Sequence, residues 1–306
     1  MVKNRRLCSK EKRRKKVNKK EQIFDIFCNS VVFVLTLLVL YPVIYVVSCS
    51  FSAPEAVSSG RVWLFPVDFS LASYRAILKY DAIWSGYKNT IIYTVVGTMI
   101  NIAMTMVCAY PLSRKNLYGR KTIMLLFTFT MLFSSGMIPG YILITKLHMI
   151  DTIWALVLPG AMSVYNMIVA RTFIENNISN ELLEAAKIDG CNDFYYFFKM
   201  VLPLSKTIIA VLALWYAVGH WNAYFGAFLY LNDSSKYPLQ IILREILVNN
   251  EVSGEVLDLE LEAQMQALKT LLKYAVIVVS SAPLMFFYPF AQKYFVKGVM
   301  IGSVKG

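Results

Sequence analysis

Charged residues and metal ligands are scarce in this sequence of 306 residues. Only 16% of the residues are charged, whereas 57% are hydrophobic. A soluble domain usually carries charge nearer about 25%. The sequence has two histidines and five cysteines, and no two cysteines form a Cys-x-x-Cys pair. No zinc or iron–sulfur site is therefore indicated, and we expect no cofactor. The composition favours a membrane protein.

The sequence also lacks the motifs of common catalytic sites. No Gly-x-x-x-x-Gly-Lys-[Ser/Thr] phosphate loop occurs in it, so the chain is not expected to hydrolyse ATP. The acidic residues of the stretch 232–270 are scattered and form no Ser/His/Asp or metal constellation, which argues against a membrane enzyme. Ionisable residues are almost absent from the long apolar runs, where a transporter driven by an ion gradient would use them.

Positive charge, by contrast, is concentrated at one end of the chain. The net charge is +12, and eleven basic residues precede Phe24: Lys3, Arg5, Arg6, Lys10, Lys12, Arg13, Arg14, Lys15, Lys16, Lys19 and Lys20. The positive-inside rule assigns such a segment to the cytoplasm, so we interpret residues 1–24 as a basic cytoplasmic tail that also attracts anionic lipid headgroups. No aromatic residue precedes Phe24 to stack on bases, and no nucleic-acid partner is expected.

Six apolar stretches are long enough to cross a bilayer as helices, since about 20 residues span its hydrocarbon core. They cover about 31–51, 89–112, 122–144, 153–174, 206–231 and 271–295, and the third is interrupted by Gly136 and Pro139. Six crossings put both termini on one side, and the distribution of Lys and Arg makes that side the cytoplasm. We therefore predict an all-α polytopic membrane protein with a cytoplasmic N-terminus and C-terminus and a transmembrane domain over 25–306.

Two connections on the outer side, residues 52–88 and 232–270, are longer than plain turns. Each can be interfacial packing with solvated loop, or a docking surface for an external partner. The residues alone favour neither interpretation.

The connection between the fourth and fifth crossings, residues 178–204, has the pattern of a helix–turn–helix elbow. Ser179 or Asn180 can cap a helix, and Gly190 suits the left-handed position that ends one. Ala185 and Ala186 are small, so another protein surface could approach the backbone closely. The positive-inside rule places this elbow in the cytoplasm. The local pattern alone favours a simple joint between two crossings.

Several residues of the elbow resemble the EAA loop of ABC importer permeases. The matching positions, which also have the spacing of the family motif, are Glu184, Ala185, Ala186, Asp189, Gly190, Leu202 and Pro203. Many relatives have Pro where this chain has Ser179, and Ala where it has Cys191. Both residues are small and keep the helix start and the turn plausible.

Two further segments resemble carbohydrate-uptake permeases related to the smaller membrane subunit of the maltose system. They are Trp221-Asn222 in the fifth crossing and the C-terminal residues 292–306, so the resemblance covers nearly the whole chain from Phe24 onward. It implies that residues 25–306 form an ABC importer transmembrane domain in the bacterial cell (inner or cytoplasmic) membrane. The implied function is import of sugars, above all oligosaccharides, by alternating access. The alternatives are an ABC permease for a non-sugar solute and a secondary transporter driven by an ion gradient.

The resemblance also implies partners and roles for residues. We expect a second permease subunit that forms a heterodimer with this chain, a cytosolic ATPase dimer, an extracellular solute-binding lipoprotein and a sugar substrate. The elbow would be the coupling helix, and its ATPase-coupling residues would be Glu184, Ala185, Ala186, Asp189 and Gly190.

Polar and aromatic residues of the fifth crossing suggest a substrate path, because aromatic faces stack on sugars and Asn can both donate and accept hydrogen bonds. The candidates are Tyr216, Trp221, Asn222 and Tyr224. The same residue types also pack helices against each other, so this role has a structural alternative. His220 has no carboxylate in crossings four to six to pair with, which argues against a proton relay.

Overall fold

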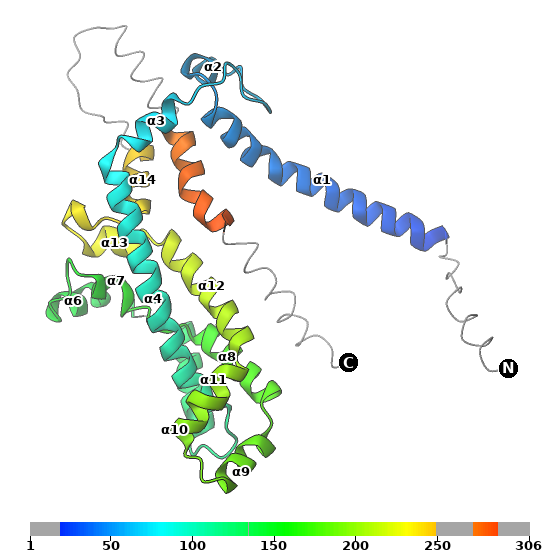
Figure 1. The fold of residues 1–306 in the computed structure, drawn as a ribbon, viewed down its shortest axis with the longest axis vertical. Coiled ribbons are helices and arrows are strands. Elements are labelled where there is room, and N and C mark those ends of the chain that lie inside the picture. The colour runs from blue at the N-terminus through cyan, green and yellow to red at the C-terminus, as the bar shows by residue number, and fades with distance from the viewer. Residues whose placement is uncertain (1–18, 134, 249–271, 287–306) are drawn as a thin grey trace.

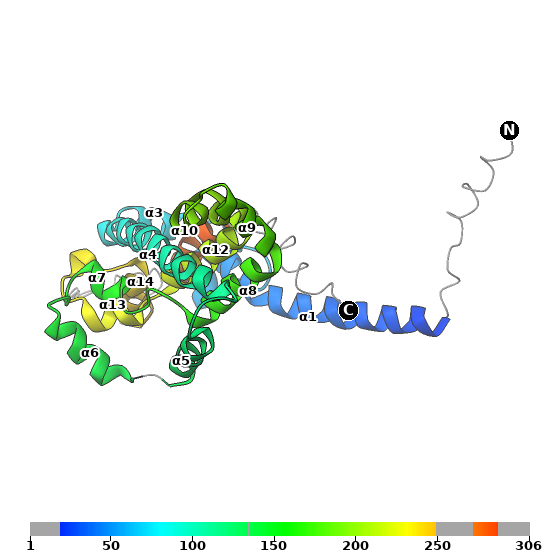
Figure 2. The ribbon, with the colours of Figure 1, turned by 90° about the horizontal axis from the view of Figure 1, so that it is seen from below.

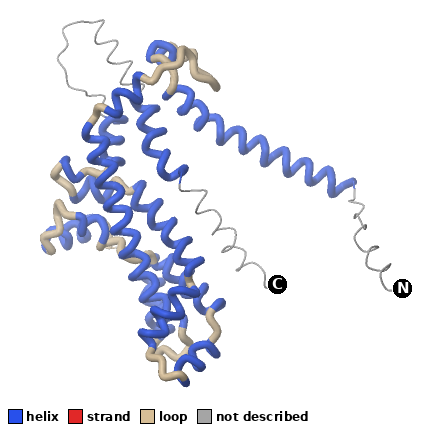
Figure 3. Tube along the Cα trace, in the orientation of Figure 1, coloured by secondary structure: helices blue, strands red, loops and turns tan. Residues whose placement is uncertain are grey.

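The computed structural model describes residues 19–133, 135–248 and 272–286, and these ranges contain helices and loops but no strand (Figure 3). The predicted all-α class is therefore confirmed for the described residues. The helices are α1 (Lys19–Ser50), α2 (Pro54–Ser58), α3 (Ala72–Leu78), α4 (Asp81–Ser113), α5 (Arg120–Leu132), α6 (Met137–Lys146), α7 (Ile153–Val157), α8 (Val164–Asn177), α9 (Asn180–Ile188), α10 (Asp193–Tyr196), α11 (Leu202–Leu204), α12 (Lys206–Asn222), α13 (Phe225–Tyr230), α14 (Leu239–Val248) and an unlabelled helix, Leu272–Phe286.

Only some of the six predicted crossings are single long helices in the part of the chain that is described. Ile23–Ser50 and Asp81–Ser113 are each long and apolar enough to cross a membrane. Two bent pairs of helices, Arg120–Leu132 with Met137–Lys146 and Asp193–Leu204 with Lys206–Asn222, bring the number to four if each pair is one span. The sixth predicted crossing is described only over Leu272–Phe286.

The predicted fourth crossing, 153–174, is not one helix. It consists of α7 and α8, which are separated by residues 158–163. Pro159 disfavours helical backbone at the residue before it, and Gly160 costs a helix more than any other residue except proline. The side-chain amide of Asn101 on α4 donates to the carbonyl of Gly160, so the interruption leaves this carbonyl with a partner. The fifth predicted crossing, 206–231, is likewise divided into α12 and α13.

Helix α4 is the centre of the bundle, and α8, α12 and α14 all pack against it. It runs from α3 and α14 at one end to the α9–α10 elbow at the other (Figure 1). Helix α1 projects away from the rest of the chain, and its candidate membrane span is unburied (Figure 2). The apolar surface of α1 therefore needs lipid or another subunit to cover it.

Two polar contacts join α4 to α12. The ring of His220 lies against Gly97, where an added Cβ would approach Nε2 to 2.5 Å. His220 Nε2 and Asn101 Oδ1 are 2.6 Å apart. One helical turn away on α12, the hydroxyl of Tyr216 lies 2.7 Å from Thr105 Oγ1. These groups fix the separation and the register of the two helices.

The loops at the α3 end are also held by polar contacts. Lys236 Nζ lies 2.9 Å from Asp151 Oδ2, and Asp151 Oδ1 accepts from the backbone N–H groups of Asn232 and Asp233 at 3.2 Å each. The hydrogen bond from Lys236 lowers the pKa of Asp151 below its usual value. The α6–α7 turn is thereby attached to the connection between α13 and α14.

Candidate coupling elbow and membrane cavity

The first helix of the elbow, α9, begins and ends as its sequence predicts. Ser179 caps α9, because its Oγ accepts from the backbone N–H of Leu182 at 3.4 Å. Gly190 has φ +79°, which is the left-handed conformation. The N–H of Gly190 donates to Lys187 O at 3.0 Å, and that of Cys191 donates to Ala186 O at 2.9 Å. This pair of bonds is the Schellman motif, which satisfies two carbonyls that the helix end would leave free.

A second short helical segment follows the turn, also as predicted. Asn192 caps α10 by accepting from the N–H of Tyr195 at 2.7 Å. The chain continues as a π-helical turn, Phe197–Val201, and then as α11, which contains Pro203. At Ser205 the direction changes by 77° and α12 begins. The second part of the elbow is therefore helical as far as Leu204 and joins α12 through a sharp bend at Ser205.

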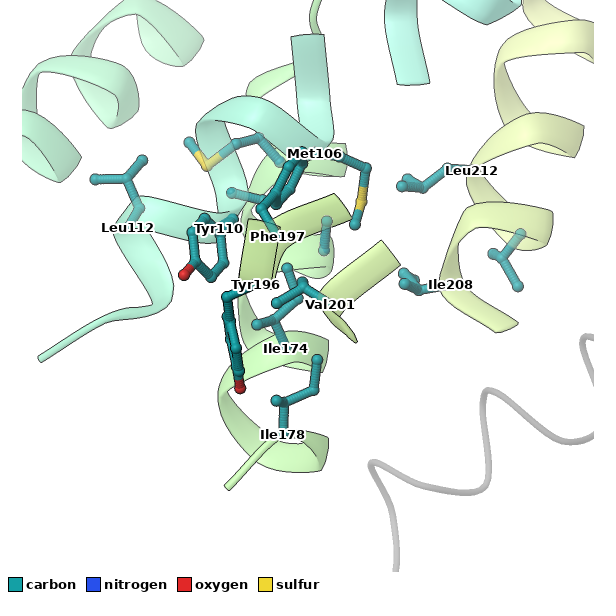
Figure 4. Packing of buried hydrophobic residues seen from close by; sticks show 14 of the residues in the cluster. Met106, Tyr110, Leu112, Ile174, Ile178, Tyr196, Phe197, Val201, Ile208 and Leu212 are labelled. Carbon is teal, nitrogen blue, oxygen red and sulfur yellow. The ribbon is translucent and has the colours of Figure 1, made fainter. Parts of the chain in front are cut away.

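The inner face of the elbow belongs to the largest buried apolar cluster of the described residues. Leu183 and Ala186 of α9 and Tyr196, Phe197 and Val201 after the turn are all buried in it. The cluster also takes residues from three other helices: Met106, Tyr110 and Leu112 from α4, Ile174 from α8, and Ile208 and Leu212 from α12 (Figure 4). The elbow thus moves only if these three helices move with it or the cluster opens.

The outer face of the elbow carries large apolar side chains that nothing in the described chain covers. Ile188 is 86% exposed and Phe194 is 79% exposed. Four of the five predicted coupling residues, Glu184, Ala185, Asp189 and Gly190, are exposed on the same segment. Exposed apolar residues grouped in this way are typical of a protein–protein contact.

Ala186 differs from the other four predicted coupling residues. Its side chain is 3% exposed and packs in the apolar cluster. The expectation that both alanines offer a small outward surface is therefore wrong for Ala186, because the helical repeat turns neighbouring side chains about 100° apart.

An Arg–Glu–Arg cluster lies between the elbow end of α4 and helices α5 and α8. Arg120 and Arg171 each bind one carboxylate oxygen of Glu175, at 2.7 and 2.9 Å. Each arginine also donates through Nε to the carbonyl of Leu112, at 2.8 and 2.9 Å. Leu112 lies in the last turn of α4, where carbonyls have no helical partner. This cluster was not predicted, because in the sequence Arg120 and Arg171 contribute only to the distribution of basic charge that indicates the topology.

A cavity of about 480 Å³ lies at the other end of α12. Two candidate path residues, Asn222 and Tyr224, line it, together with residues of α14 and of Leu272–Phe286. Tyr216 and Trp221 do not line it. Tyr216 is 8% exposed and its hydroxyl accepts from the N–H of Ser163. Trp221 is 7% exposed and donates from Nε1 to Ser280 O at 3.1 Å.

Comparison with known proteins decides the family. The family model described as "Binding-protein-dependent transport system inner membrane component" matches residues 23–301. This chain belongs to that family. It is therefore an inner-membrane component of a bacterial transport system that works with a binding protein, and a transport subunit rather than an enzyme.

Similar proteins are known from both sequence and structure. The polygalacturonan/rhamnogalacturonan transport system permease protein YtcP of Bacillus subtilis is 42% identical over 288 residues, covering 94% of this chain and 100% of the relative. The melibiose/raffinose/stachyose import permease protein MelC of the same organism is 27% identical, covering 80% and 84%. A chain of a bacterial ABC transporter involved in the import of the acidic polysaccharide alginate superposes with a TM-score of 0.83 and 34% identity, covering 91% of this chain and 98% of that chain.

Two segments whose roles are predicted from the sequence lie outside the residues that the structure describes. They are residues 1–18 of the basic tail and the C-terminal segment 292–306. The acidic stretch of the second long outer connection is described only as far as Val248, where α14 ends.

Proposed function

We propose that this chain is a permease subunit of an ATP-driven importer of oligosaccharides. The observation that carries the proposal is the elbow, which has an apolar, uncovered outer face and an inner face packed on α4, α8 and α12. The names of the relatives support the substrate class, since those proteins are described as permeases for oligosaccharides or polysaccharides. The cavity lined by Asn222 and Tyr224 supplies polar and aromatic groups suited to sugar hydroxyls and ring faces.

The proposed topology has six crossings, with both termini and the elbow in the cytoplasm. Residues 1–24 form the basic tail and residues 25–306 the transmembrane domain. Helix α4 separates the elbow from the α3–α14 end (Figure 1), so with the elbow in the cytoplasm that end lies toward the outside. The cavity, which residues of α14 line, then lies toward the outside as well.

The proposed partners are a second permease subunit, a cytosolic ATPase dimer and an extracellular solute-binding lipoprotein. ATP hydrolysis takes place on the ATPase subunits. When the ATPase pair closes, it displaces the exposed face formed by Glu184, Ala185, Asp189 and Gly190. The shared apolar cluster passes this displacement to three helices, so that access to the cavity alternates between two states. Ala186 contributes to coupling from inside, by holding α9 on the cluster.

The substrate path reduces to Asn222 and Tyr224. Both side chains are exposed in this chain and face the cavity, whereas the polar atoms of Tyr216 and Trp221 are used in contacts between helices. We assign Tyr216 and Trp221 to the helix packing that shapes the path.

Two neighbouring alanines provide a matched test. In a background with all five natural cysteines replaced by serine, we would compare Ala185→Cys with Ala186→Cys in native membranes, using a thiol cross-linker and identifying the products by mass spectrometry. We expect Ala185→Cys to be joined to an ATPase subunit, and Ala186→Cys to remain unreacted because it is buried. Co-purification from mild detergent should also recover a second permease and a binding protein. Recovery of the chain alone, with neither variant cross-linked, would refute the coupling role.

A further inference from the structure

Among the described residues that line the cavity beside Asn222, one has a cationic side chain, Arg244. The cavity is formed by three segments: the end of α12 with the residues just after it, one side of α14, and one side of Leu272–Phe286. Gln240 and Arg244 lie one turn apart on α14 and therefore face the cavity together. A volume of about 480 Å³ is in the range of ligand-binding sites.

The backbone of α14 that carries Arg244 is fixed, because the other side of the helix packs on α4. The backbone N–H of Leu239 donates to Thr90 Oγ1 at 2.8 Å. At Gly86 an added Cβ would lie 2.5 Å from Ile242 Cδ1, so the two helices touch with no room for a side chain. Leu239, Ile242 and Leu243 are buried in the same apolar cluster as Ile83 of α4.

The exposed guanidinium of Arg244 lies over an aromatic ring and has no anionic partner within the described ranges. Its Cζ lies 4.7 Å from the centroid of Phe228. None of the ion pairs found there includes it. The N–H groups of a guanidinium match the two oxygens of a carboxylate.

Neutral polar groups surround this cation. Asn222 Nδ2 donates to Val218 O at 2.8 Å, which leaves its Oδ1 as an acceptor for a hydroxyl. Gln240 and Ser281 also line the cavity. One guanidinium among several neutral hydrogen-bonding groups is suited to a molecule with many hydroxyls and one carboxylate per unit.

We propose that this cavity binds an acidic oligosaccharide, with a uronate carboxylate on Arg244 and sugar hydroxyls on Asn222 and Gln240. This inference rests on the proposed function and narrows its substrate class to sugars that carry carboxylates. Arg244 is then a specificity-determining residue, because a neutral sugar would leave its charge without a partner.

The test compares one oligosaccharide with and without its charge. The complete importer, with its binding protein, is placed in nanodiscs, and stimulation of ATP hydrolysis is measured with trigalacturonate and with its neutral trimethyl ester. For Arg244→Gln we expect the response to trigalacturonate to fall at least about tenfold relative to that of the ester, since a charge-assisted hydrogen bond is lost. Arg244→Lys should retain part of the response. Lys146→Gln removes an exposed positive charge at the end of α6, away from the cavity, and should change the response to neither probe.

Other outcomes separate this inference from the proposed function. If the wild-type importer responds to the ester or to neutral oligosaccharides but not to trigalacturonate, the carboxylate site is wrong and the sugar importer stands. The carboxylate site is also wrong if Arg244→Gln weakens the response to both probes equally, because Arg244 then stabilises the fold. It is wrong, too, if the effect follows the lipid charge, in phosphatidylglycerol against phosphatidylcholine nanodiscs, because Arg244 then binds a lipid phosphate. A wild-type importer that responds to no saccharide would overturn both proposals.

Discussion

The turn at Gly190 allows the coupling elbow to be tested through backbone conformation alone. A Cβ built at this position meets no atom within 4 Å, so a side chain adds no clash in this chain. The cost of a substitution then comes from φ +79°. For an ordinary residue, left-handed backbone costs roughly 1–2 kcal/mol, or about 5–30-fold in the population of the turn. Asn tolerates this region better than Ala, whereas the proline ring fixes φ near −65°.

These differences predict a ranked series of transport rates. Gly190→Asn should transport at nearly the wild-type rate, Gly190→Ala several-fold more slowly, and Gly190→Pro not at all. Proline also removes the N–H that donates to Lys187 O. The assay is initial uptake of a labelled oligosaccharide into cells, corrected for the amount of inserted protein and accompanied by co-purification of the ATPase. Wild-type uptake by Gly190→Pro would refute the reasoning. If Asn were as harmful as Pro, side-chain bulk at the docking surface would be the cause instead.

Three further predictions concern the packing that supports the two sites. Glu175→Ala leaves two partly buried arginines without their carboxylate, which we expect to cost about 2–3 kcal/mol and to lower the Tm of the purified protein by about 4–10 °C. Gly97→Ala forces the ring of His220 away from α4, so it should lower the Tm and weaken the α4–α12 contact in thiol cross-linking. The lowered pKa of Asp151 means that its contact with Lys236 stabilises the fold fully above about pH 4, and that this contribution is lost as the pH falls through the lowered pKa. A Tm measured against pH should show this decrease in the wild type and not in Asp151→Asn.

Each of these predictions has a matched control or a contradicting result. Glu181→Ala removes an exposed acidic residue of the elbow and should change the Tm by less than about 1 °C. Gly219→Ala places a methyl group on α12 where no atom lies within 4 Å, so it should leave the α4–α12 contact intact. If Asp151→Asn showed the same decrease at low pH as the wild type, another acidic group would be responsible.

The elbow could be predicted closely because its signals are local. Ser179 and Gly190 each set the backbone of their own turn, and a cap or a left-handed position requires no knowledge of the rest of the fold. The direction of Ala185 and Ala186 could not be predicted in this way. It depends on which side of α9 meets α4, α8 and α12, and both alanines look alike in sequence.

The break in the fourth crossing was missed although Pro159-Gly160 marks it. Average hydropathy over about 20 residues identifies a crossing by composition and does not register an interruption of six residues. The side-chain amide that makes the break possible belongs to Asn101, far away in the sequence. The substrate path was predicted by residue type, and Tyr216 and Asn222 were equal candidates. Only their partners distinguish them, since Tyr216 bonds two other segments and Asn222 bonds its own helix.

The Leu112 carbonyl, held by two guanidinium groups, gives α4, α5 and α8 a common point of attachment near the elbow. If the bundle tilts about this point, the displacement of each residue of α4 grows with its distance from Leu112. A helix of 33 residues at 1.5 Å per residue is about 50 Å long. A rotation of about 10° would then carry the far end about 9 Å sideways, while the nearby coupling surface moves only slightly. A small displacement by the ATPase would therefore be sufficient for a large opening at the outer end of the transport path.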